Sequence, residues 1–179
     1  EKLHKSKQHV YCLLGDGECQ EGEVYEALHF GNKYQLNNLT VFVDYNAIQL
    51  SGPLQEIMPI DLPAIFRSSH WNVIEVNGHD FKKLWAALHE ARLEPHVPTV
   101  IIGKTIMGKG VSFMEKDSQE NTFNWHGVAP SSEQADQALE ELEVSQEEQA
   151  QLKLFREKQV LWKPEQPFGI EKSPPQMNI

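Results

Sequence analysis

The sequence of 179 residues lacks several features that mark particular classes of protein. Its two cysteines, Cys12 and Cys19, are too few for a disulfide framework or a four-ligand zinc site. No apolar run approaches the length needed to span a bilayer, and no secretory signal is visible in the sequence, so we expect neither. Free thiols are ordinary in a reducing compartment, so we expect a cytoplasmic protein.

Basic residues are also scarce. The chain has 16 Lys and Arg against 26 Asp and Glu, which gives a formal net charge of −10. Proteins that bind nucleic acid or anionic lipid need basic residues to neutralise phosphates, so we expect neither partner. Hydrophobic residues make up 40% of the chain, enough to bury a core, which argues against wholesale disorder.

Short apolar runs alternate with segments of helical periodicity. The first run, residues 10–14, is apolar at every position, which predicts a strand buried on both faces of a parallel sheet. This alternation predicts an α/β fold, a parallel sheet with helices on both faces. Further strands are expected at residues 39–43, 71–76 and 99–102, and helices at residues 21–34, 61–69 and 80–92.

The remainder of the chain is more polar. Residues 103–132 contain four glycines and predict a long loop that is functional or disordered. A following helix carries an apolar stripe that we expect to pack in the core, and a charged helix extends over residues 145–161. The stripe consists of Ala135, Ala138, Leu139 and Leu142. We divide the chain into an α/β domain (1–142), a charged helix (143–162) and a proline-rich extended or disordered tail (163–179).

Polar residues follow the first two strands. Gly15-Asp16-Gly17 comes after the first, and Asn46 comes shortly after the second. Ligands of open parallel sheets bind beyond the carboxyl ends of the strands. A carboxylate and an amide oxygen suit Mg²⁺, and glycines let a phosphate approach the backbone closely. Either motif alone is also a common turn, so the pair in this order is the informative feature.

The spacing of these residues resembles a known family. Gly15-Asp16-Gly17, 28 residues and then Asn46 is similar to the thiamine-diphosphate motif of thiamine-dependent enzymes. The blocks GDGECQEGEVYEALHFGNKYQLNNL, VDYNAIQLSG, KTIMGKGVSFMEK and NWHG resemble transketolases in order and spacing. The nearest likeness is to the N-terminal subunit of split transketolases, over residues 10–142. The family's region before the first strand has no counterpart here, so we expect an incomplete domain.

The resemblance implies roles for individual residues. Asp16, the Asn46 side chain and the backbone carbonyl of Ile48 would bind Mg²⁺. His126 would lie beside the cofactor diphosphate and the reacting substrate, and Glu21 would reach a partner chain at the active-site interface. The remaining cofactor contacts implied by the family are Gly15, Gly17, Glu18 and Lys104.

The implied activity is that of a transketolase. Thiamine diphosphate and Mg²⁺ would support transfer of a two-carbon glycolaldehyde unit from a ketose phosphate to an aldose phosphate. A partner chain carrying the pyrimidine-binding domain, or a second copy, would complete the site. Two alternatives stay open: another thiamine-dependent enzyme, such as a deoxyxylulose-phosphate synthase or a dehydrogenase E1 component, and a non-catalytic paralogue that acts as a regulatory partner.

Overall fold

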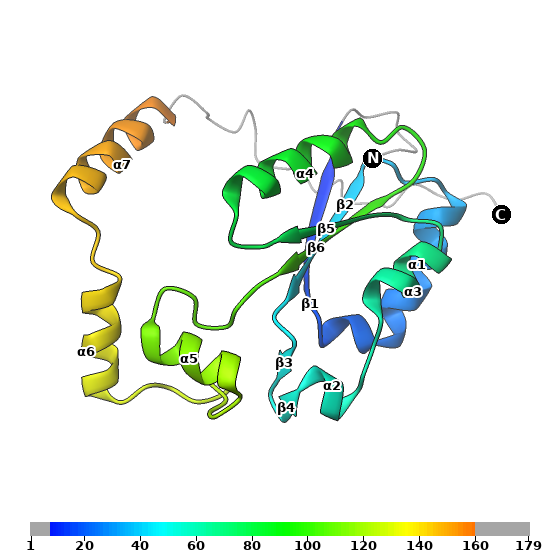
Figure 1. Ribbon diagram of the computed structural model, residues 1–179. Helices are drawn as coiled ribbons and strands as arrows, with labels where there is room; N and C mark the ends of the chain where they lie inside the picture. Colours follow the sequence, from blue (N-terminus) through cyan, green and yellow to red (C-terminus); the bar gives the residue numbers. More distant parts are fainter. Residues whose placement is uncertain (1–7, 160–179) are drawn as a thin grey trace, which may run out of the picture. The chain divides into compact units, whose positions relative to one another are not determined.

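The computed structural model describes residues 8–159 and contains a parallel sheet of four strands in the order β1-β2-β6-β5 (Figure 1). The strands are β1 (Val10–Gly15), β2 (Leu39–Tyr45), β5 (Asn72–Asn77) and β6 (Thr99–Lys104). The helices around the sheet are α1 (Gly22–Lys33), α3 (Leu62–Ser68) and α4 (Phe81–Leu93). The predicted α/β fold, its four strands and these three helices are therefore confirmed within one or two residues at each end.

Helices cover both faces of the sheet, α1 and α3 on one side and α4 on the other (Figure 1). Successive side chains of a strand point to opposite faces, so each strand serves two cores. On the first face, Val43 and Ile102 pack with Phe66 of α3. On the second, Ile101 packs with Ala87 and Ala91 of α4. Both faces of the two central strands are consequently buried.

Strand β1 differs from the expectation of a strand buried on both faces. It lies at the edge of the sheet and pairs with β2 alone within residues 8–159. Tyr11 is 53% exposed and Leu13 is 69% exposed. An apolar run shows that a strand tolerates burial, but its position in the sheet decides whether neighbours cover it.

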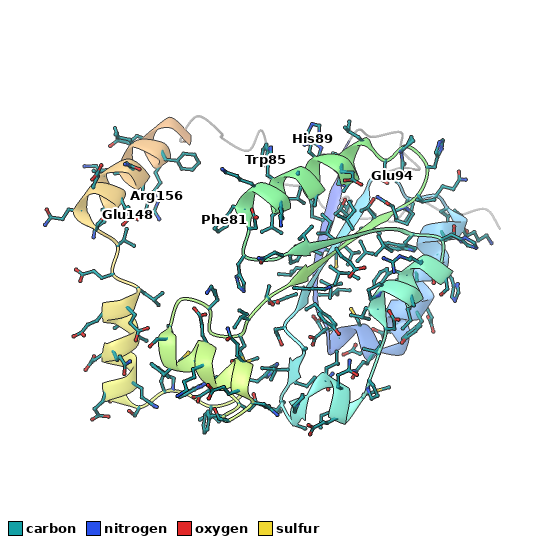
Figure 2. All side chains as sticks on the ribbon, viewed as in Figure 1. Phe81, Trp85, His89, Glu94, Glu148 and Arg156 are labelled. Atoms are coloured by element: carbon teal, nitrogen blue, oxygen red, sulfur yellow. The ribbon has the colours of Figure 1, made fainter. Side chains whose placement is uncertain are left out.

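Helix α4 also presents apolar residues outward. Phe81 and Trp85 are 85% and 74% exposed, and Figure 2 shows them along this helix with His89. Trp85 and His89 line a groove of about 330 Å³ together with Tyr11 of β1. Exposed rings of this size contribute little to folding, because burial is the source of hydrophobic stabilisation.

The predicted loop over residues 103–132 is wrong in part, because α5 occupies Ser112–Glu120. Its N-terminus has no local side-chain cap; instead the Glu141 carboxylate accepts hydrogen bonds from the Ser112 backbone N–H and hydroxyl. Glu141 lies 29 residues away in the sequence, so no local capping motif predicts this helix. A small hairpin and a one-turn helix were also not predicted: β3 (Ile48–Gln49), β4 (Gly52–Pro53) and α2 (Leu54–Ile57).

Helix α6 (Ser132–Glu141) contradicts the expected core stripe. It has no buried residue, and Leu139 is 67% exposed. Among the described residues, 8–141 belong to one compact unit and 142–159 to another. In the second unit, α7 covers Gln146–Gln159; residues 160–162 of the expected charged helix and the predicted tail at 163–179 lie outside the described residues.

None of the helices within residues 8–159 is long and apolar enough to cross a membrane.

Candidate cofactor site

The motif residues meet where β1 and β2 end. Gly15 is in register with Asp44, and the Asp16 backbone N–H donates to the Asp44 carbonyl at 3.2 Å. A cavity of about 460 Å³ opens at this edge of the sheet. It is lined by Gly15, Asp16, Gly17, Glu18, Asn46, Ile48, Gln49, Leu50, Ser51 and His126. The predicted meeting of Asp16, Asn46 and His126 in one place is therefore observed.

Asp16 is the buried charge of this cavity, with only 3% of its surface exposed. Burial raises the pKa of its carboxyl, and the nearby Asp44 adds to the rise, whereas hydrogen bonds from the Ala47 and Gly17 N–H groups and the neighbouring His126 oppose it. In residues 8–159 no Lys or Arg forms an ion pair with Asp16. A cation bound in the cavity would compensate this charge.

Ala47 contacts Asp16 through its backbone. Its N–H donates to Asp16 Oδ2 at 2.6 Å. Ala47 has a φ of 62°, a left-handed conformation that is uncommon for a residue with a Cβ. The Asn46 side chain supports the turn, because its Oδ1 accepts the Ile48 N–H at 2.9 Å. Sequence reasoning missed Ala47, since alanine carries no signal for positive φ.

The two glycines beside Asp16 are not required by packing of the chain itself. A Cβ at Gly15 or Gly17 would meet its nearest neighbour at 3.6 Å or 3.5 Å, which is ordinary contact. Neither glycine has a positive φ; Gly17 lies in the right-handed helical region. Since neither packing nor backbone conformation explains these glycines, their lack of a side chain suits a backbone that a ligand approaches closely.

A turn after α5 brings His126 to the cavity. Asn124 Oδ1 accepts the His126 N–H at 2.9 Å, and Trp125 Nε1 donates to Asp117 Oδ2 of α5 at 2.9 Å. The rings of Phe113 and Phe123 lie 5.3 Å and 4.6 Å from the Trp125 ring. The turn is thus anchored on α5, a helix that the sequence did not reveal.

Of three other predicted residues, Glu18 also lines this cavity, whereas Glu21 and Lys104 lie elsewhere. The Glu18 carboxylate accepts the Gly15 N–H at 2.6 Å, so this backbone donor is already engaged. Glu21 precedes α1 and lines another pocket, beneath β1. Lys104 forms an ion pair with Glu75 at 3.2 Å and lines a separate cavity of about 510 Å³ beyond β6. The structure therefore does not bring Lys104 or Glu21 to the Asp16 cavity.

The donor set of the cavity fits Mg²⁺ with a phosphate ligand. No group of three His, Cys, Asp or Glu suitable for a metal occurs in the described part of the chain. The cavity is instead lined by two carboxylate residues (Asp16 and Glu18), two amide residues (Asn46 and Gln49) and Ile48, whose backbone carbonyl is a further possible ligand. Mg²⁺ is commonly held by one or two carboxylates, water and substrate phosphates, so these residues fit the ion when a diphosphate completes its shell.

The two thiols differ in environment, which gives a chemical test of the packing around this site. Burial, with the charges of Asp16 and Glu18 nearby, raises the pKa of Cys19 to about 12. Cys12 is exposed on β1. We expect an alkylating reagent at neutral pH to modify Cys12 and spare Cys19 until the chain unfolds, as read by mass spectrometry. Equal labelling of both thiols in the native protein would contradict the buried position of Cys19.

A known protein family matches most of the chain. The family described as "Transketolase, thiamine diphosphate binding domain" matches residues 1–172. The chain belongs to the transketolase family. The match extends beyond the resemblance recognised in the sequence, which ended at residue 142.

Relatives of this transketolase-family chain include separate subunits and whole enzymes. It is 34% identical over 142 residues to one subunit of the apulose-4-phosphate transketolase of Phocaeicola vulgatus, covering 79% of this chain and 49% of that protein. It is 37% identical over 140 residues to human transketolase, covering 77% of this chain and 21% of the enzyme. The chain thus spans about half the length of the bacterial protein and about a fifth of the human one.

Solved structures agree on the fold. Transketolase from Campylobacter jejuni superposes with a TM-score of 0.57 at 23% identity, covering 87% of this chain and 27% of that one. Transketolase from Leishmania mexicana gives a TM-score of 0.56 at 22% identity, covering 85% and 26%. At this identity the likeness shows the α/β fold of a thiamine-diphosphate-binding domain.

Proposed function

We propose that this chain forms the diphosphate-binding part of a transketolase that uses thiamine diphosphate and Mg²⁺. The enzyme would transfer a two-carbon glycolaldehyde unit from a ketose phosphate to an aldose phosphate. The observation that carries this proposal is the buried Asp16 carboxylate, which lies at the strand ends beside Asn46 and His126. No Lys or Arg among residues 8–159 forms an ion pair with it. Family membership gives the reaction class in which such a site is used.

Each cavity residue has a role in this proposal. Asp16, Asn46 and the Ile48 carbonyl would hold Mg²⁺, and Gly15, Gly17 and Glu18 would face the diphosphate. The imidazole of His126 would bind beside the diphosphate and hold or move a proton near the substrate, since imidazoles are suited to proton transfer near neutrality. Thiamine diphosphate, when bound, supplies the carbanion chemistry that breaks and forms the carbon–carbon bond.

A partner chain would complete the active site. Relatives of this chain are named as transketolase subunits, one for apulose-4-phosphate and one for 6-deoxy-6-sulfo-D-fructose. Both names support a separately encoded partner, and the first supports a sugar phosphate as substrate, whereas the second names a sulfonated sugar. Glu21, exposed at the start of α1, would contact the partner. We also propose the division into residues 1–142, 143–162 and 163–179, and a cytoplasmic location.

Cofactor titration tests the proposal directly. Thiamine diphosphate with MgCl₂ should bind the full chain saturably, as followed by calorimetry and tryptophan fluorescence. At a hundredfold excess over the dissociation constant, binding stabilises the native state by about 2.7 kcal/mol. That gain corresponds to a rise in melting temperature of roughly 5–10 °C for a chain of this size.

Metal removal is the matched control. EDTA should abolish the thermal shift, and MgCl₂ added in excess should restore it, because the diphosphate binds through the ion. A chain that shows no saturable binding in the presence of Mg²⁺ would contradict the proposed site. Binding without turnover when a partner chain is supplied would favour the non-catalytic paralogue instead.

A further inference from the structure

The turn that carries His126 is joined to the segment after the proposed Mg²⁺ ligands by one side chain, Asn124. Its Nδ2 donates to the Gln49 carbonyl at 2.7 Å and to the Leu50 carbonyl at 3.1 Å. Its Oδ1 accepts the His126 N–H at 2.9 Å. One amide therefore ties together two segments that are about 75 residues apart in the sequence.

We propose that Asn124 is a positioning residue, which fixes His126 over the cavity of Asp16 and thereby sets the affinity of the site for thiamine diphosphate. The inference rests on the proposed function. Asn124 itself does not line the cavity, whereas Gln49, Leu50 and His126 do. It acts through the residues that it holds.

Packing of the neighbouring residues explains why the Asn124 hydrogen bonds affect the position of the His126 turn. On its far side the turn is held by α5, through the Trp125–Asp117 hydrogen bond and the contact of the Trp125 ring with the Phe113 ring. On its near side, a Cβ at Gly127 would lie 2.4 Å from Leu50 Cδ1, so the backbone runs close to Leu50. Without the Asn124 bonds, α5 alone would set the position of the turn.

The expected effect on binding is larger than the effect on folding. His126 is exposed and sits on a turn rather than on a helix or strand, so its place depends on local hydrogen bonds. A small displacement of a group that contacts a ligand lowers affinity strongly, since binding sites tolerate shifts of only about 0.5 Å. Asn124 is half-buried, and its loss leaves two carbonyls at the cavity rim that water can reach.

Two substitutions separate the functions of the amide. Asn124→Asp keeps the acceptor for the His126 N–H but removes both donors to the Gln49 and Leu50 carbonyls. Asn124→Ala removes all three hydrogen bonds. The matched control is Asn77→Ala, because Asn77 Oδ1 accepts the His79 N–H at 2.9 Å in the same kind of turn away from this cavity.

The dissociation constant of thiamine diphosphate, measured by calorimetry with MgCl₂ in the full chain, is the first readout. We expect both Asn124 variants to weaken binding about tenfold, which corresponds to about 1.4 kcal/mol, and Asn77→Ala to leave it unchanged. A purely structural role would instead lower the melting temperature of all three variants with no change in affinity. That result, or wild-type affinity in both Asn124 variants, would overturn the inference.

A second readout needs no cofactor. Nuclear Overhauser contacts between the Leu50 methyl groups and Gly127 should be present in the wild-type chain and lost in Asn124→Asp. If these contacts persist in the variant, the inference is overturned, whether or not the wild-type chain binds the cofactor. If the wild-type chain binds no cofactor, the proposed function is contradicted instead. Failure of the inference and failure of the function are therefore distinguished.

Discussion

Asp16→Asn is expected to stabilise the cofactor-free chain while abolishing most of its Mg²⁺-dependent cofactor binding. The carboxylate is buried with no cationic side chain among residues 8–159 to pair with, so it costs stability when charged. The neutral amide of Asn can still accept the Ala47 N–H. We expect a gain of about 1 kcal/mol, or roughly 2–4 °C in melting temperature, with a loss of affinity of about a hundredfold or more.

The dependence on pH follows from the raised pKa of Asp16. Because the folded pKa lies above the unfolded one, the unfolded chain releases this proton first as the pH rises, and stability then falls. The melting temperatures of wild type and Asp16→Asn should therefore agree near pH 3, below the ordinary carboxyl value of about 3.9. The difference should grow as the pH rises from the ordinary carboxyl value to the raised pKa of folded Asp16, and stay constant above it.

Asp80→Asn serves as the control for the loss of one negative charge. The Asp80 side chain caps α4 by accepting hydrogen bonds from the backbone N–H groups of Lys82 and Lys83, and Asn is an equally good cap. Asp80→Asn should not change the affinity for the cofactor. The difference between its melting temperature and that of the wild type should not vary with pH in the way expected for Asp16→Asn. If Asp16→Asn were less stable than wild type at neutral pH, the carboxylate would not be an uncompensated charge and the argument for a cation site would fail.

Phe66→Ala should give the largest loss of stability in this chain, about 3–5 kcal/mol. Phe66 is 1% exposed in the core between α3 and the sheet, and its ring meets the Trp71 ring at 5.5 Å and 72°. Trp71 in turn donates from Nε1 to the Leu28 carbonyl at 3.0 Å. The truncation leaves a cavity under α1 and α3 and loosens this contact, which small domains with a stability of about 5–15 kcal/mol barely tolerate.

Urea denaturation measures the effect, and Phe81→Ala is the matched control. Phe81 is 85% exposed on α4, so its removal should change the unfolding free energy by less than about 0.5 kcal/mol. The slope of the unfolding free energy against urea concentration should be similar in both variants if they unfold in two states. Comparable losses at the two positions would show that Phe66 does not pack as described.

Much of the fold could be predicted because local patterns match local structure. The four apolar runs became the four strands, and the helices expected at residues 61–69 and 80–92 became α3 and α4, with Asp61 and Asp80 as their caps. The same reasoning failed for the exposure of β1 and of the α6 stripe. Periodicity reports which residues are apolar, whereas burial depends on which elements lie beside them.

The candidate site divides in the same way. Asp16, Asn46 and His126 could be selected from the sequence because a motif names residues that carry chemistry. Ala47 and Asn124 could not, because their part lies in a left-handed backbone and in hydrogen bonds to residues 31 and about 75 positions away. Lys104, which the resemblance implied as a cofactor contact, is the last residue of β6 and forms an ion pair with Glu75 instead.

The sequence by itself determined the alternation of strands and helices, the family and the polar residues that follow the first two strands. Tertiary structure decided which strand lies at the edge, how Glu141 caps α5, and how the His126 turn is tied to the Asn46 segment. The physical reason is the sequence separation over which each kind of interaction acts. Propensity, periodicity and motifs act over a few neighbouring residues, whereas burial and long-range hydrogen bonds exist only once distant segments have met.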